Sequence, residues 1–273
     1  SIETSHDKSV AHVRYPAGEH DSIQYHFFCE GLLFSVRIFR TDSLERHYVW
    51  LYDGATVKKL VNSSETILQG PVNFLQVASP ALTLTAEPDK GIISIYIDAE
   101  SLVEIKFQVN NSFTYLPTQQ TEPVTHLPDL TCTVVYQSRK MTGTGYCKRY
   151  FGSYPATWEY RFIHCVSPSF TLWSADALFG SNQYCYFHLL PQEGPHISSL
   201  NEGSSVSDSS VQALVANQRY EVRFKRIASF RIRLRSDVMD SLLQQQYCHA
   251  TLHCRNQIVT SLCLNETCAG TLG

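Results

Sequence analysis

The chain has 273 residues, of which 43% are hydrophobic and 12% aromatic, and its formal net charge at neutral pH is −3. This composition predicts a globular protein with a sizeable core and excludes an intrinsically disordered chain. The absence of a basic run argues against nucleic acid as a partner, and no apolar segment reaches the roughly 18 residues that a transmembrane helix needs.

The first half of the chain consists of short segments that alternate apolar and polar residues between Gly, Pro, Asn, Asp and Ser, which predicts antiparallel strands. In the segment 46–54, RHYVWLYDG, the alternation places Tyr48, Trp50 and Tyr52 on one face. Two interpretations fit this face equally well. It is either one layer of a core that covers both sides of the strand, or the aromatic wall of a ligand cavity.

A proline-rich segment, 113–131, separates the two halves of the chain and predicts a connection between domains. We therefore expect two antiparallel β-domains of the barrel or sandwich type with very little helix, spanning 1–122 and 123–273. The only helix predicted is a short one at 237–246, DVMDSLLQQQ.

The second half contains a strand, 157–165, in which Trp158, Tyr160, Phe162 and His164 share one face. An aromatic core and a pocket for a flat apolar ligand both fit this row. Arg161 points to the opposite face.

A hairpin, 171–187, follows with a turn predicted at 180–182. Its acid, Asp176, shares a face with Leu172 and Leu178. A carboxylate in this setting needs hydrogen bonds or a charged partner, which the turn near Gly180 or Arg161 could supply. The alternative is a functional carboxyl at the mouth of a cavity.

Nine cysteines and three Asn-x-Ser/Thr sequons favour the secretory pathway or the extracellular space. We expect several disulfides, one of them between Cys263 and Cys268. The sequons offer three candidate glycosylation sites: Asn62, Asn110 and Asn265.

Enzyme signatures are absent from the sequence. It has no G-x-S-x-G elbow, no H-E-x-x-H motif, no P-loop and no G-x-G-x-x-G segment that opens a helix. Neither a metal nor an organic cofactor is therefore expected.

Two consecutive segments, TGTGYCKRYFGSYPATWEYRF and FTLWSADALFGSNQYCYF, resemble a block found in lipocalin-like proteins of the hydroxyneurosporene synthase and AttH type. The matching residues cover about 50 residues of the chain; they are Gly143, Gly145, Tyr146, Gly152, Trp158, Trp173, Asp176, Ala177, Gly180 and Tyr184. Many members carry an acid-His or Trp-Gly pair after the G-Y element. This chain has Lys148-Arg149-Tyr150-Phe151 instead, which disfavours hydratase chemistry.

The resemblance extends to fungal Diels-Alderases built from two lipocalin-like β-domains, including the hetero-Diels–Alderases of tropolonic sesquiterpene pathways. It implies a cofactor-independent pericyclase of secondary metabolism that acts on a polyene or terpenoid. The candidate catalytic residues are Tyr160, His164, Arg161 and Asp176. The candidate substrate-binding residues are Tyr48, Trp50, Tyr52, Trp158, Trp173, Tyr184 and Tyr186. The alternatives are a carrier of lipids or terpenoids, and a proton-driven terpenoid cyclase or hydratase.

Overall fold

The computed structural model describes residues 12–13, 19–40, 44–66, 70–71, 75–115, 124–153, 155–167, 169–200, 204–235, 239–254 and 257–272. All regular secondary structure within these ranges is β-strand, which confirms the all-β prediction. All pairings between neighbouring strands are antiparallel, as two-residue hairpins and short loops require.

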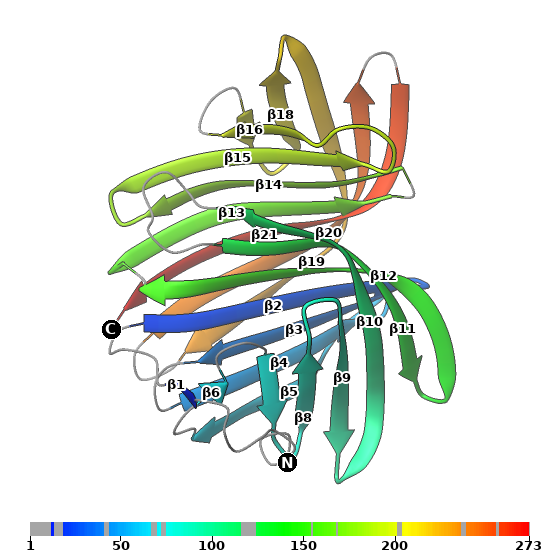
Figure 1. The fold of residues 1–273 in the computed structure, drawn as a ribbon, viewed down its shortest axis with the longest axis vertical. Coiled ribbons are helices and arrows are strands. Elements are labelled where there is room, and N and C mark those ends of the chain that lie inside the picture. Colours follow the sequence, from blue (N-terminus) through cyan, green and yellow to red (C-terminus); the bar gives the residue numbers. More distant parts are fainter. Residues whose placement is uncertain are drawn as a thin grey trace. The chain divides into compact units, whose positions relative to one another are not determined.

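The first compact unit contains a ten-stranded sheet in the order β5-β4-β3-β2-β12-β11-β10-β9-β8-β7 and a small pair, β1-β6 (Figure 1). Its strands are β1 (His12–Val13), β2 (Glu19–Cys29), β3 (Leu32–Arg40), β4 (Leu44–Tyr52), β5 (Val57–Thr66), β6 (Gly70–Pro71), β7 (Leu75–Ala78), β8 (Leu82–Ala86), β9 (Lys90–Ile97), β10 (Glu100–Tyr115), β11 (Val124–Tyr136) and β12 (Arg139–Ser153).

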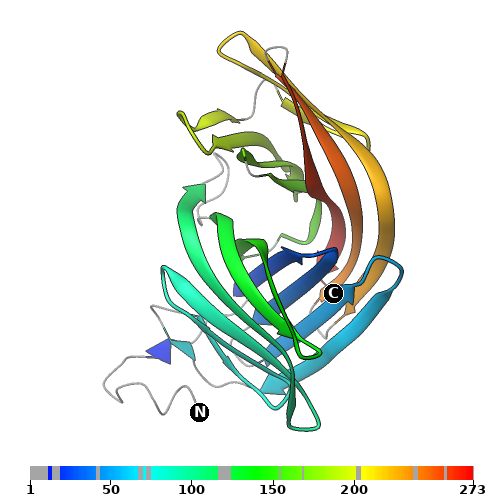
Figure 2. The same ribbon diagram turned by 90° about the vertical axis from the view of Figure 1, so that its right-hand side faces the viewer.

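The second unit is a nine-stranded sheet in the order β16-β15-β14-β13-β21-β20-β19-β18-β17. Its strands are β13 (Thr157–Val166), β14 (Phe170–Phe179), β15 (Asn182–Pro191), β16 (Ile197–Leu200), β17 (Ser204–Val206), β18 (Ser210–Val215), β19 (Gln218–Arg235), β20 (Met239–Cys254) and β21 (Gln257–Leu272). The long strands β19 to β21 bend along their length (Figure 2). This curvature brings β16 into contact with β18, so the sheet nearly closes on itself.

Two sequence-based boundaries need correction. The units divide after Ser153 rather than at residue 122, because β11 and β12 pair with β10 and β2 and complete the first sheet. From Met239 onwards, the segment predicted as a helix at 237–246 is instead part of β20, and residues 237–238 lie outside the described part of the chain. Along that strand Ser241, Leu243 and Gln245 are buried and alternate with more exposed neighbours, which is a period of two.

Each sheet packs one face into an apolar core. In the first unit this core combines side chains from the centre of the sheet with Val61 of β5 and Val77 of β7, which lie at its two ends. In the second unit it combines Leu172 of β14 with Val211 of β18 and Val222 of β19. A curved sheet therefore wraps around each core, and the opposite face of its central strands is left for other side chains.

Candidate functional site

The opposite face of the second unit carries aromatic and polar side chains that are also buried. On β13 it presents Trp158, Tyr160, Phe162 and His164, as the alternation predicts. Their partners in register on β14 are small: Ala177 lies opposite Tyr160, and Ala175 lies opposite Phe162. We call this surface the polar face of the second unit.

A buried carboxylate, Glu266, lies at the centre of this face. It is fully buried on β21, in register with Phe162 of β13 and Gln245 of β20. The Tyr160 hydroxyl donates to Glu266 Oε1 at 2.7 Å, and the Gln245 amide donates to Glu266 Oε2 at 2.7 Å. Both carboxylate oxygens are thus held by neutral donors, which fixes the direction of the carboxyl group among the rings.

Trp158 packs against the backbone at one end of the same face. A Cβ placed on Gly270 would lie 2.1 Å from Trp158 Cζ2, so only glycine fits beneath this ring. The residue lies on β21, in register with Trp158. The close approach holds the indole flat near the Tyr160–Glu266 pair.

A second aromatic group on this face contains two imidazoles. Trp173 stacks on His188 with ring centroids 4.9 Å apart, and His188 Nδ1 lies 3.0 Å from His196 Nε2. Tyr186 contacts His188 with a centroid separation of 5.4 Å. Burial, and then the neighbouring His196, lowers the pKa of His188 to about 3, so the ring is neutral at physiological pH.

The four candidate catalytic residues divide between the two faces of the sheet. Tyr160 and His164 lie on the polar face, and His164 is fully buried. Arg161 and Asp176 lie opposite each other on the other face. The Arg161 guanidinium forms an ion pair with Asp208, and the Gly180 N–H donates to the Thr157 carbonyl at 2.9 Å. Neither role suggested for Asp176 is therefore supported by these contacts.

Sequence reasoning missed Glu266, Gln245 and His188. Glu266 is the middle residue of a sequon, and Gln245 falls in the predicted helix. No local sequence pattern identifies either residue as part of a site, because the two come together only through the pairing of β21 with β13 and β20. Of the predicted substrate-binding residues, Trp158, Trp173 and Tyr186 are buried on the polar face, while the Tyr184 side chain lies outside the described part of the structure.

The first unit has a polar face of its own. Tyr48, Trp50 and Tyr52 are buried on it beside the side chains of β2 and β3. The Arg37 guanidinium donates to the Gln24 side-chain oxygen, and Gln24 Nε2 lies 2.9 Å from His26 Nε2. Farther along, the Tyr146 hydroxyl and His126 Nδ1 are hydrogen-bonded at 2.5 Å. The side chains that make these polar contacts are Gln24, His26, Arg37, His126 and Tyr146.

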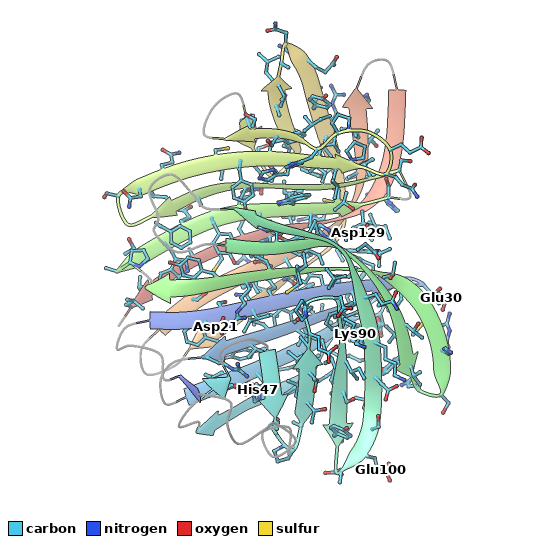
Figure 3. The ribbon with its side chains drawn as sticks, viewed as in Figure 1. Asp21, Glu30, His47, Lys90, Glu100 and Asp129 are labelled. Carbon is cyan, nitrogen blue, oxygen red and sulfur yellow. The ribbon has the colours of Figure 1, made fainter. Side chains whose placement is uncertain are left out.

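Ion pairs lie on the core face of the first unit, near one end of the sheet. Arg149 binds Asp21 through two hydrogen bonds of 2.8 and 2.6 Å, and Glu45 bridges Arg40 and His47. Figure 3 labels Asp21 and His47, one residue from each group. Burial raises the pKa of the Glu45 carboxyl, but the hydrogen bond from His47 and the charge of Arg40 outweigh it, and the pKa is lowered overall.

The predicted disulfide between Cys263 and Cys268 is wrong. Both residues belong to β21, and an odd spacing places their side chains on opposite faces, with Cα atoms roughly 16 Å apart in an extended strand. Each of the eight described cysteines is a free thiol in the structure. Cys263 lies in the apolar core beside Cys165, whereas Cys268 lies near Ser241.

The three sequons differ in exposure. Asn62 and Asn110 are exposed. Asn265 is only 2% exposed in the middle of β21, and its amide lies 3.5 Å from the Asp208 carbonyl. A glycan at Asn265 does not fit this fold, because the acceptor nitrogen faces the interior.

Each unit also contains a pocket. The first is about 780 Å³ and the second about 500 Å³. The second is lined by Trp158 and Gly270 together with Leu178, Leu242 and the Arg233–Asp240 ion pair. Tyr160, His164 and Glu266 do not line it.

Two structural searches concern metals and membranes. Among the described residues, no group of three or more His, Cys, Asp or Glu side chains could hold a metal ion. No helix in the described part of the chain is long and apolar enough to cross a membrane.

Comparison with known proteins gives the fold a context. No family model and no curated protein sequence matches the chain. Among solved structures, kievitone hydratase from Nectria haematococca is similar, with a TM-score of 0.62 and 8% identity over 95% of this chain and 93% of that one. A putative AttH from Nitrosomonas europaea has a TM-score of 0.56 and 13% identity over 91% of each chain.

CghA has a TM-score of 0.57 and 7% identity over 94% of this chain and 89% of that one. The three structures span almost the whole length of both units at very low sequence identity, so what they share with this chain is the fold. The resemblance to lipocalin-like proteins of the AttH type, first indicated by the sequence block around Trp158 and Trp173, is confirmed by this common fold.

Proposed function

We propose that this chain is a cofactor-independent enzyme that binds a small hydrophobic polyene or terpenoid at the polar face of the second unit and catalyses a Diels–Alder or hetero-Diels–Alder cycloaddition. The observation that carries the proposal is the Tyr160–Glu266–Gln245 network set among aromatic rings. It supplies oriented polar groups in surroundings that otherwise suit a flat apolar molecule.

A cycloaddition needs no nucleophile. It needs two π-systems held in one reactive geometry, and such positioning can contribute on the order of 7 to 11 kcal/mol in the best intramolecular cases. The rings of Trp158, Phe162 and Trp173 are rigid surfaces of the kind that can hold a substrate in place. Ala175 and Ala177 are the small residues opposite Phe162 and Tyr160 on β14.

The polar groups act on the electronics of the substrate. A hydroxyl donor directed at a carbonyl of the dienophile or heterodiene lowers the barrier, because negative charge grows on that oxygen in the transition state. Tyr160 is our candidate for this donor: its single hydroxyl proton, which bonds Glu266 Oε1 in the free protein, turns to the substrate oxygen when substrate binds. His164, buried on the same face, is the candidate for a second polar contact.

A hydratase is the second candidate function. The observation that favours it is Glu266 itself, because addition or removal of water requires an acid or base, and a buried carboxyl can serve as either. The name of kievitone hydratase, which shares the fold, is consistent with this alternative. A carrier that only binds terpenoids is the remaining possibility, and activity measurements separate it from both enzymes.

The test is turnover of a linear polyene with a tethered dienophile in water labelled with oxygen-18. A product of unchanged formula supports the cycloaddition, whereas incorporation of the label identifies a hydratase. Binding without turnover identifies a carrier. The same assay after dialysis against EDTA should give an unchanged rate, and activity restored only by added metal would contradict the cofactor-free mechanism.

Variants connect the reaction to the network. Tyr160→Phe removes the hydroxyl donor and keeps the ring, so we expect slower turnover with little change in substrate binding. Tyr146→Phe is the matched control, because it makes the same substitution in the first unit, where the hydroxyl bonds to His126 outside the network. Equal loss of turnover in both variants would contradict a role for Tyr160 in the reaction.

A further inference from the structure

We propose that Cys165 and Cys263 form a disulfide that joins β13 to β21 inside the apolar core of the second unit. This covalent site is independent of the proposed reaction, since both residues point to the core and away from the polar face. It replaces the pairing of Cys263 with Cys268 by one that the strand register allows.

The register places the two residues opposite each other. Cys165 and Cys263 are direct partners across the antiparallel pair β13–β21. Such partners have Cα atoms about 4.5 or 5.5 Å apart, depending on the hydrogen-bonding position, and a disulfide accepts about 4.4 to 6.8 Å. No movement of the backbone is therefore required.

The sulfur atoms are already close. The Sγ atoms of Cys165 and Cys263 lie 2.6 Å apart, whereas the sulfur atoms of a disulfide are about 2.05 Å apart. Both residues are fully buried among apolar side chains. Covalent closure needs only a small further approach of the two sulfurs.

A third cysteine, Cys248, is the alternative partner for Cys263. Cys248 of β20 also lies opposite Cys263, on its other side. The Cys248 sulfur is directed elsewhere, with its Sγ 3.8 Å from the Gln246 carbonyl. Burial raises the thiol pKa of both Cys248 and Cys263, so the pKa does not distinguish the partners, and the choice of Cys165 rests on the separation of the sulfur atoms.

The bond forms by thiol–disulfide exchange with a small disulfide such as oxidised glutathione. One cysteine thiolate attacks that disulfide and releases one glutathione thiolate, which leaves a mixed disulfide on the protein. The second cysteine thiolate then attacks the protein sulfur of the mixed disulfide and releases the second glutathione. The two cysteines lose two protons and two electrons, and the oxidant becomes two thiols. Because both sulfurs are buried in the finished fold, the exchange precedes closure of β21 onto β13.

Peptide mapping tests the assignment. The full chain is refolded in a mixture of reduced and oxidised glutathione, denatured with N-ethylmaleimide, and digested without reductant. We expect a linked pair of peptides that contain Cys165 and Cys263, with Cys248 and Cys268 alkylated. Alkylated Cys263, or a link from Cys263 to Cys248 or Cys268, overturns the proposal.

Thermal unfolding supplies a second measurement. Reduction should lower the Tm of the wild-type chain by on the order of 10 °C, because the bond closes a loop of nearly a hundred residues. The variant Cys165→Ala should lose this sensitivity to reductant, and Cys268→Ala, on the same strand as Cys263, should keep it. If Cys165→Ala fails to fold, the peptide map of the wild-type chain decides alone.

Discussion

The polar faces of the two units differ in the charge that each one buries. The face in the first unit contains a guanidinium, Arg37, which donates to the side-chain oxygen of Gln24. The face in the second unit contains a carboxylate, Glu266, which accepts from a phenol and an amide. A buried charge is costly unless polar groups are arranged around it, and each sheet meets this need with neutral side chains on adjacent strands.

The difference indicates how a single β-architecture can divide its tasks. A carboxylate can accept, hold and return a proton near neutral pH, whereas a guanidinium keeps its proton throughout the physiological range. The polar face of the second unit therefore contains a group that can change its charge, whereas Arg37 gives the face of the first unit a permanent positive charge.

Removal of the charge of Glu266 should have the largest effect. Glu266→Gln keeps the shape but replaces one acceptor oxygen with an NH2 group that must face Tyr160 or Gln245. We expect turnover to fall by about 10-fold or more, because the Tyr160 hydroxyl loses its charged acceptor, a hydrogen bond worth on the order of 1.5 to 3 kcal/mol. The matched variant in the first unit is Tyr146→Phe, which removes the hydroxyl bonded to His126 and should leave turnover nearly unchanged.

Single-turnover rates measured on folded fractions of equal amount check this prediction. Equal losses in the two variants would show that the reacting groups are not confined to the second unit.

A methyl group added at a closely packed glycine should lower the stability of the first sheet more than that of the second. A Cβ at Gly143 would lie 1.9 Å from the Phe28 carbonyl oxygen, whereas at Gly270 it meets only the ring of Trp158. Because backbone moves less easily than a side chain, we expect Gly143→Ala to cost about 3 kcal/mol or more and Gly270→Ala about 1 to 2 kcal/mol. Urea unfolding of both variants measures the order, and a larger cost at Gly270 would contradict it.

Mild acid should destabilise the second unit before the first. The pKa of His188 is lowered to about 3 in the folded protein. As the pH falls, the imidazole is therefore protonated in the unfolded chain before it is protonated in the folded one, and stability is lost from about pH 6.5 towards pH 3. At pH 5 the expected loss is on the order of 2 kcal/mol. The pKa of Glu45 in the first unit is also lowered, but from a carboxyl value, so its contribution is present above about pH 4.3 and disappears only below it.

Hydrogen exchange at pH 7 and pH 5, followed separately for β14–β15 and β3–β4, resolves the two units. The variant His188→Asn should make protection of β14–β15 less dependent on pH across this range. Equal weakening of both regions at pH 5 in the wild-type chain would count against the assignment to His188.

The smallest effect is expected at Asp176. Its side chain is half-buried on the face opposite Glu266, so Asp176→Asn should change turnover by no more than about twofold, as is usual for partly exposed sites outside a network. Paired measurements of Tm and turnover check this. A variant with wild-type Tm and no activity would place an acid–base group on the core face.

Much of the fold can be predicted from local pattern. The alternation in RHYVWLYDG and TWEYRFIHC correctly predicts which residues share a face, because a strand has a fixed period of two. The turn after Phe179 follows from Gly180, which adopts a φ of 61°. Several other hairpins turn at pairs with positive φ that carry no glycine, such as Asp98-Ala99 and Gln137-Ser138, and composition does not reveal them.

The candidate site could be predicted only in part. Tyr160 and His164 are recognisable because their own strand is aromatic. Glu266 lies 106 residues from Tyr160 in the sequence, and the two meet only because β21 inserts beside β13. The helix expected at 237–246 failed for a related reason, since two leucines and three glutamines in a row suit a helix until neighbouring long strands impose an extended conformation.

The position of β21 in the sequence also decides when the second sheet can be completed during synthesis. It follows every other described strand in sequence, yet it lies between β13 and β20 in the sheet. Until it has been synthesised, β13 and β20 each have an unpaired edge, and the β13–β16 and β17–β20 segments meet only through the contacts of β14–β16 with β17 and β18, which leaves the nascent chain open to aggregation. Late synthesis of β21 therefore makes completion of this sheet, and with it burial of Glu266, a late event in biosynthesis that a holding chaperone would assist.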